Sequence, residues 1–342
     1  CGFDWGYRSM VNVSFYNSDI DFKNKNPFNN SSISCTDKDF IRYLINLGAF
    51  SNTKLSFNGM KFYFSLVKMA IEEKNGIFEI SDDYFNAEAT IKTAISYFIG
   101  SMAAYAIAEK EYNVPFLFHL KDPVIKNITR YKGYNNKSPD FFGFKNFDFH
   151  TPILIEAKGT YRSNLATSTV FKAKAQVNAI KSIDFRNSLR KITKFDRHVV
   201  GAYFENRELN ICDIDPEDTG TITYKFDNDF EILMYYKNIM FLILFNYKDS
   251  KTITMNNNNY IFVEFEGYKL GLNSFIFGTL KEYFRIDESE KLFINFMDLK
   301  YRNETNLFKS IFNFSYEVYY SYENYLHKDS SISLGRDGII VM

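Results

Sequence analysis

The sequence predicts a mixed α/β protein whose central part is a sandwich of three layers. Residues 81–113 carry apolar side chains at helical spacing, and three short apolar runs suited to strands follow within residues 116–158. A second helical pattern at 167–180 then precedes a further strand at 199–204. The order helix, three strands, helix, strand is typical of a sheet covered by helices, and neither an internal repeat nor a Gly-rich phosphate loop competes with it.

The composition is that of a folded globular protein. The chain has 342 residues, of which 46% are hydrophobic, and its formal net charge is +0, so any surface for a polyanion must be local. Its three cysteines, Cys1, Cys35 and Cys212, have no CxxC spacing and an odd total. This argues against a disulfide framework and a structural zinc site, and it favours a reducing, cytoplasmic location.

No stretch of the sequence predicts a helix that spans a membrane. The most apolar stretch, residues 239–245, is far short of the ~20 residues that span a bilayer, so it is predicted to be a core element. The chain opens with Cys1 rather than Met, as a processed lipoprotein would. A sequence that lacks its true start is the favoured alternative, and whether Cys1 is the true N-terminus stays open.

Three regions are expected along the chain. Residues 1–80 are an N-terminal segment of uncertain fold with a polar, Asn-rich loop at 22–32. Residues 81–215 hold the predicted sandwich. Residues 216–342 form a C-terminal α+β region, a candidate for binding a partner or substrate.

The first helix is predicted from Ser81 to near residue 113. Ser81 offers an N-cap, and one apolar stripe follows the helical repeat. Glu88 lies on this stripe, so its carboxylate is expected to point toward the sheet, which makes Glu88 a candidate catalytic residue and metal ligand there. The alternative, that an acid there only favours the helix N-terminus, stays open. The stripe comprises Ile91, Ile95, Phe98, Ile99, Met102 and Ala106.

The strands are predicted at 116–120, 139–144 and 152–158, with a polar loop at 122–138 between the first two. The run Ile153-Leu154-Ile155 is typical of a central strand covered on both faces. The stretch 208–214 follows the strand at 199–204 closely and continues the pattern.

Residues 153–160, ILIEAKGT, carry the chemistry. Alternate side chains of a strand share a face, so Glu156 and Lys158 are expected to project together. Both would be costly to bury unless paired or bound to a metal. Asp140 stands sixteen positions before Glu156, at the start of the preceding strand, and an antiparallel hairpin would bring the two carboxylates together. Such an oxygen-rich site suits Mg²⁺ or Mn²⁺, with Lys158 positioning water or offsetting charge.

The stretches SPDFFG, ILIEAKGT and KAKAQV, preceded by a Glu-bearing helix, resemble the PD-(D/E)xK nuclease superfamily, which includes restriction endonucleases, RecB-type nucleases and Holliday-junction resolvases. The resemblance implies a restriction-endonuclease-like three-layer α/β/α core with a mixed sheet, plus N- and C-terminal additions. It implies that Asp140 and Glu156 bind the metal, that Lys158 assists hydrolysis, and that the carbonyl of Ala157 is a further ligand.

One branch of the superfamily has a Gln on the following helix, which would make Gln176 a phosphate or metal-water contact. That branch continues with a Tyr four residues later, where this chain has Ile180. A narrower resemblance covers roughly residues 88–180 and the terminal LGRDGIIV. It looks like a poorly characterised group of bacterial proteins that carry this core, and it implies no particular substrate.

A basic tract follows the predicted site, which is the local charge that a polynucleotide backbone requires. The alternative is an ordinary solvated helix face. The four histidines share no ligand spacing and are expected to be structural or surface residues. The tract from 158 to 197 holds two acids and ten basic residues: Lys158, Arg162, Lys172, Lys174, Lys181, Arg186, Arg190, Lys191, Lys194 and Arg197.

Two functions compete. The leading hypothesis is a metal-dependent endonuclease that hydrolyses phosphodiester bonds, with DNA favoured over RNA; a restriction or anti-phage defence role rests on analogy alone. A homodimer is expected because cutting both strands commonly needs two active sites, and a defence-system partner is a further expectation. The alternative is a catalytically silent nucleic-acid-binding or assembly subunit that keeps the nuclease-like fold.

Overall fold

The structure of this protein is a computed structural model. Its described residues fall into two compact units, which are treated separately. The sheet unit comprises Tyr7–Phe40 and Ser65–Phe226, and the C-terminal unit comprises Cys1–Gly6, Ile41–Phe64 and Asp227–Met342. The structure describes residues 9–47, 57–120, 127–130, 133, 137–148, 151–184, 195–215, 224–225, 228–255, 257–286, 292–294, 307, 310–315 and 331–342.

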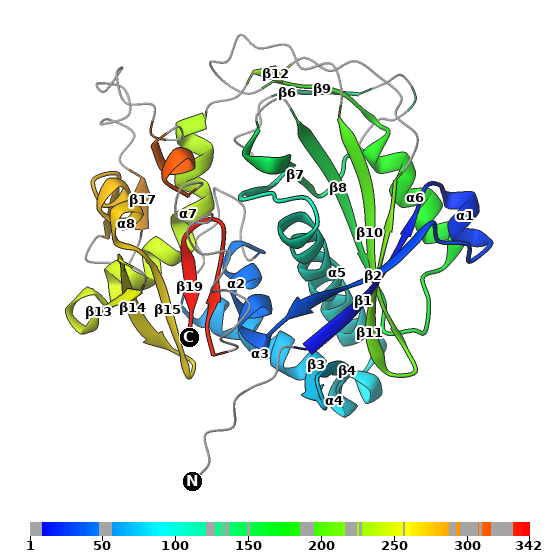
Figure 1. Cartoon of the computed structure of the whole chain (residues 1–342), viewed down its shortest axis with the longest axis horizontal. Coiled ribbons are helices and arrows are strands. Elements are labelled where there is room, and N and C mark those ends of the chain that lie inside the picture. Colours follow the sequence, from blue (N-terminus) through cyan, green and yellow to red (C-terminus); the bar gives the residue numbers. More distant parts are fainter. Residues whose placement is uncertain are drawn as a thin grey trace. The chain divides into compact units, whose positions relative to one another are not determined.

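The sheet unit is a mixed α/β fold, and its described residues form a mixed sheet of nine strands (Figure 1). The strands follow the order β2-β1-β11-β10-β8-β7-β5, with β3 and β4 joined to β11 through β4. The pairs β1–β11 and β8–β10 are parallel, and the others are antiparallel. The strands are β1 (Ser9–Tyr16), β2 (Asn29–Cys35), β3 (Ile71–Lys74), β4 (Ile77–Ile80), β5 (Leu117–His119), β7 (Phe141–Phe144), β8 (Pro152–Gly159), β10 (Asp196–Glu205) and β11 (Glu208–Ile214).

The strands predicted at 116–120, 139–144, 152–158, 199–204 and 208–214 are therefore confirmed as β5, β7, β8, β10 and β11. Strand β8 lies between β7 and β10, and its run of Ile153, Leu154 and Ile155 is fully buried. This is the burial expected of a central strand with both faces covered.

Helices α5 (Ala89–Lys110) and α6 (Thr167–Val177) cover opposite faces of the sheet. A Cβ added to Gly159 of β8 would lie 1.9 Å from the carbonyl oxygen of Ser96 in α5. A Cβ on Gly201 of β10, which pairs with Lys158, would instead meet Leu165 and Cys212. These two residues belong to an apolar cluster to which α6 contributes Val170, Ala173 and Val177. Since successive strand residues face opposite ways, the two helices form the outer layers of a three-layer arrangement.

The prediction of one helix over residues 81–113 is wrong in one respect, because the described chain forms two. Ser81 caps α4 (Asp82–Asn86), Ala87 and Glu88 are extended, and α5 then runs from Ala89 to Lys110. The cap at Ser81 is confirmed by its hydrogen bond from the Tyr84 N–H, 3.0 Å long. The extended backbone at two successive residues breaks the helical ladder.

Helix α5, with 22 residues, is the described helix that is long and apolar enough to cross a membrane by length and composition. Most of it is buried inside the sheet unit. Met102, Ala104, Ala106 and Ile107 have no exposed surface, as expected of a helix in a protein core.

Two loop assignments and the end of one helix are wrong, in part because strand pairing overrides polar composition. The stretch at 22–32 contains the end of α1 (Asp19–Lys23) and the start of the edge strand β2. The loop at 122–138 contains β6 (Asn127–Arg130), and Ile180 does not continue α6 but begins β9 (Ile180–Asp184). Strands β6 and β9 pair with each other, and β12 (Tyr224–Lys225) joins them.

The C-terminal unit contains a five-stranded antiparallel sheet among its described residues, with the order β13-β14-β15-β19-β18. The stretch predicted as a core element at 239–245 lies in α7, where Ile239, Leu242 and Ile243 are fully buried. The remaining elements, two of which begin in the other unit or end there, are α2 (Asp37–Leu47), α3 (Phe57–Ala70), α7 (Asn228–Phe245), α8 (Ser274–Lys281), β13 (Lys251–Met255), β14 (Asn258–Phe265), β15 (Tyr268–Asn273), β16 (Phe284–Ile286), β17 (Leu292–Ile294), β18 (Ser333–Leu334) and β19 (Ile339–Val341).

The terminal LGRDGIIV motif and the aromatic residues after Phe230 meet in this unit. The hydroxyl of Tyr235 donates to the Asp337 carboxylate at 2.6 Å, and that of Tyr236 donates to the Asp337 carbonyl at 2.5 Å. Both tyrosines and Asp337 are buried. These aromatic side chains therefore pack in the core, and Tyr316, Tyr319, Tyr320, Tyr322 and Tyr325 lie outside the described residues.

The close approach of α5 to β8 gives a testable expectation. Gly159→Ala places a methyl group 1.9 Å from the Ser96 carbonyl, so the helix or the strand must move, and we expect the free energy of unfolding to fall by about 3 kcal/mol. The control is Gly278→Ala in α8, where a Cβ meets nothing within 4 Å, and which should be neutral or stabilising. Urea denaturation of both variants decides the matter, and equal stability would contradict the packing.

Candidate active site

The pairing of β7 with β8 brings two predicted site residues together. Phe141 lies opposite Ile155 in an antiparallel register, so Asp140, which directly precedes β7, faces Glu156. The antiparallel pairing that the sequence predicted is thus confirmed. Strand β7 begins at Phe141, opposite Ile155, whereas β8 continues to Gly159. The last residues of β8, including Lys158, therefore extend past the start of β7.

Asp140 is held in place by neighbouring backbone groups. Its carboxylate oxygen Oδ2 accepts a hydrogen bond from the Ala157 N–H at 3.1 Å, and its carbonyl accepts one from the Leu120 N–H at 2.8 Å. The side chain is half-buried. The start of β7 is therefore attached to the end of β5 on one side and to β8 on the other.

Glu156 and Lys158 share one face of β8 and form an ion pair between Oε1 and Nζ. The Glu156 side chain is 1% exposed, whereas that of Lys158 is 24% exposed. A buried carboxylate requires a counter-ion, and the lysine ammonium supplies one. The ammonium carries three N–H donors, so it can bind a further acceptor while it contacts Glu156.

The donor set fits a hard divalent cation in kind. Asp140 and Glu156 supply carboxylate oxygens, and the described residues contain no cluster of three or more His, Cys, Asp or Glu side chains that would hold a metal. Mg²⁺ is usually held by one or two carboxylates and keeps several waters, so two carboxylates suffice for it. Since the Ala157 N–H points to Asp140, its carbonyl points to the same side of β8. Ala157 thus offers a third oxygen beside Asp140.

Glu88 does not occupy the position expected of an inward-pointing site acid. It is the exposed N-cap of α5, and its carboxylate accepts a hydrogen bond from the Thr90 N–H at 2.8 Å. This contact lowers the pKa of Glu88. The helix meets β8 at Ser96, about 12 Å further along its axis, on the face opposite Glu156. The helix-terminus interpretation of Glu88 is the one that the structure supports, and Ile91 of the same stripe is also exposed.

Gln176 lies in the last turn of α6, close to the segment that carries Asp140. Its amide Nε2 donates a hydrogen bond to the carbonyl of Ser138 at 3.2 Å. The predicted residue is therefore near the site, but its described contact is with the protein backbone.

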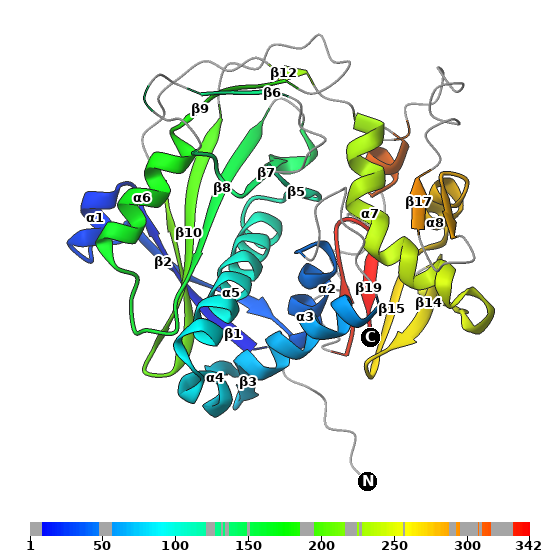
Figure 2. The ribbon, with the colours of Figure 1, turned by 180° about the vertical axis from the view of Figure 1, so that it is seen from behind.

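The basic tract is only partly available to a polyanion. Arg197 is 1% exposed and donates to the carbonyls of Val177 and Ile180, which makes it a core residue. Lys174 pairs with Asp19 of α1, which lies beside α6 (Figure 2). Arg162 and Lys172 are exposed. The side chains of Lys181, Arg186, Arg190, Lys191 and Lys194 lie outside the described part of the chain.

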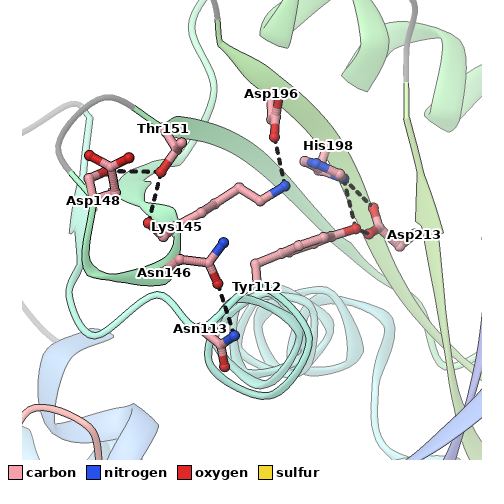
Figure 3. A network of polar contacts seen from close by, with 9 residues as sticks. All are labelled: Tyr112, Asn113, Lys145, Asn146, Asp148, Thr151, Asp196, His198 and Asp213. Carbon is pink, nitrogen blue, oxygen red and sulfur yellow. Dashed lines mark hydrogen bonds and ion pairs between the residues drawn. The ribbon is translucent and has the colours of Figure 1, made fainter. Parts of the chain in front are cut away.

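A second polar network lies on the α5 face of the same strands and was not predicted (Figure 3). The Tyr112 hydroxyl donates to Oδ2 of Asp213, whose Oδ1 lies 3.0 Å from Nδ1 of His198. His198 pairs with Ile155 of β8 and therefore faces away from Glu156. Lys145 binds Asp196 at 2.6 Å and lies 4.5 Å above the Tyr112 ring. These residues are far apart in sequence. The one local signal for the network is Asp213, an acid near the end of the apolar strand β11.

The expectation that His198 is a structural residue is confirmed, because it is buried and bound to Asp213. Burial alone lowers the pKa of His198, but the Asp213 carboxylate outweighs it and raises the pKa above the ordinary 6.5. Burial also raises the pKa of Asp215 and of Glu111, and the Asp213 charge adds to this. His198, Asp215 and Glu111 therefore hold their protons more tightly than isolated side chains would.

This raised pKa makes stability depend on pH. Folded and unfolded His198 are both protonated below ~6.5, where the ion pair stabilises the fold in full, and the stabilisation is lost as the pH rises through the folded pKa. We expect the free energy of unfolding to fall between pH 6 and pH 9, and His198→Asn to flatten that fall. Denaturant titrations over this range test the expectation, and equal slopes for variant and wild type would refute it.

The two described cysteines, Cys35 and Cys212, are buried, and no disulfide joins them. Burial raises the pKa of Cys212 to about 12, so its thiol is not a nucleophile at neutral pH. Cys1 lies outside the described residues.

Comparisons with protein families, with curated proteins and with solved structures found no match for this chain. The function must therefore be inferred from the geometry of the site itself.

Proposed function

We propose that this protein is a metal-dependent nuclease of the PD-(D/E)xK type that hydrolyses phosphodiester bonds, with DNA as the favoured substrate. The observation that carries the proposal is the position of Asp140 opposite Glu156, with Lys158 on the same face of β8 as Glu156. Two carboxylates and a lysine at the end of a buried strand are unusual unless they serve chemistry.

Asp140, Glu156 and the Ala157 carbonyl would hold Mg²⁺ or Mn²⁺. Such an ion, when bound, lowers the pKa of its water and stabilises negative charge on the phosphoryl oxygens. Lys158 is partly exposed, so its ammonium can orient a water or bind a phosphate oxygen. The exposed Arg162 and Lys172 add positive charge for the polynucleotide backbone.

The test is to incubate the purified protein with plasmid DNA, single-stranded DNA and RNA in Mg²⁺ or Mn²⁺. Cleavage that requires the metal and is lost in Glu156→Gln and Lys158→Ala would support the proposal and identify the substrate class. Binding of DNA with equal affinity with and without metal, and without cleavage, would instead support the silent-subunit alternative. A role in restriction or anti-phage defence, as a homodimer or with a defence-system partner, is part of the same proposal.

A further inference from the structure

Gln176 connects α6 with the segment that carries Asp140. The Nε2 of Gln176 donates to the carbonyl oxygen of Ser138 at 3.2 Å across 38 positions of the sequence. Ser138 is 3% exposed, and Pro139 is also buried. A side-chain amide that donates to a buried backbone carbonyl holds that backbone in place. It is not directed at a ligand in solvent.

The backbone between Ser138 and Asp140 is stiff. Pro139 fixes its own φ, and the residue before a proline is confined to extended conformations. A contact that fixes the Ser138 carbonyl therefore also restricts the position of Asp140. With the hydrogen bonds from Leu120 and Ala157, Asp140 is held from three directions, by β5, β8 and α6.

The helix that carries Gln176 is itself well anchored. Ala173 and Val177, one turn before Gln176 and next to it, have no exposed surface and pack in the apolar cluster against Val199 and Cys212. The Lys174–Asp19 ion pair ties the same turn to α1. The side-chain amide of Gln176 therefore acts from a rigid base.

We propose that Gln176 is a positioning residue that holds the Ser138–Asp140 segment so that the Asp140 carboxylate faces Glu156. The metal-related part of this inference rests on the proposed function. It differs from the phosphate or metal-water contact that the sequence resemblance implies, because the amide acts through the backbone before Asp140.

The first test is amide hydrogen exchange on the metal-free protein. Gln176→Met keeps the volume but removes the donor, so exchange in residues 137–141 and at the Ala157 amide should speed up about fivefold, as expected for one lost hydrogen bond. Gln176→Lys, which restores a donor, should return exchange toward the wild-type rate. Ser168→Ala, an exposed change in the first turn of the same helix, is the matched control and should alter nothing. Unchanged exchange in folded Gln176→Met would overturn the proposal.

The second test separates positioning from substrate contact. Titration calorimetry with Mn²⁺ alone should show a Kd about tenfold weaker in Gln176→Met, whereas affinity for a DNA oligonucleotide without metal should not change. Weaker DNA binding with unaltered Mn²⁺ binding would instead identify a substrate contact and overturn positioning. If the wild type binds no Mn²⁺, the proposed nuclease function fails, while the exchange experiment still decides whether Gln176 positions Asp140. Circular dichroism and thermal unfolding confirm that each variant is folded.

Discussion

Glu156→Gln is expected to lower metal-dependent cleavage by at least about 10²-fold while the fold is retained. The substitution keeps the shape of a side chain that is 1% exposed but removes the charge that would balance the metal. Lys158, at 24% exposure, can turn to solvent when its partner becomes neutral, so stability should change little. The measurement is kcat/KM for plasmid nicking in Mg²⁺, together with the unfolding midpoint.

Glu205→Gln is the matched control for this experiment. Glu205 ends β10 of the same sheet and is exposed, so its neutral variant should cleave at the wild-type rate. If Glu156→Gln cleaves as fast as this control, the carboxylate is not part of the active site. If both lose activity together with their thermal transition, the loss reflects unfolding rather than chemistry.

Asp213→Ala is expected to lower the free energy of unfolding by about 3 kcal/mol. Asp213 is 2% exposed and accepts from both Tyr112 and His198, so its removal leaves the buried His198 and the half-buried Tyr112 without their acceptor (Figure 3). Because Asp213 raises the pKa of His198, the imidazole in the variant should also lose its proton at a lower pH. Urea denaturation and NMR titration of His198 measure the two effects.

Asp196→Ala is the control, since Asp196 is 52% exposed in its pair with Lys145 and should contribute less than about 1 kcal/mol. A double mutant, Asp213→Ala with His198→Ala, should lose less than the sum of the two single losses, because the pair acts as a unit. Losses of similar size in Asp213→Ala and Asp196→Ala would show that burial does not govern this network.

The elements that were predicted well are those with a strong local signal. The strands at 152–158 and 199–204 are long apolar runs, and α6 has a clear helical stripe from Val170 to Val177. The elements that were missed have polar or short sequences, such as β2, β6 and β9. Their conformation depends on hydrogen bonds to a neighbouring strand, which no local pattern encodes.

Glu88 shows the same limit at the level of a single side chain. Its spacing from Ile95 and Ile99 placed it on the apolar stripe, yet Glu88 is the exposed N-cap of α5, and Ile91 in the first turn is exposed as well. A helical period says which residues share a face but not how far along the helix that face is covered.

The pairing of the Asp140 segment with β8 and the shared face of Glu156 and Lys158 could be predicted from the sequence, because a hairpin register and a two-residue repeat are local properties. Three features could be seen only in the folded chain. They are the hydrogen bond from Gln176 to Ser138, the burial of Arg197, and the network of Tyr112, His198 and Asp213. Each of these contacts joins segments distant in the chain, and burial, not local pattern, selects the partner that satisfies a polar group.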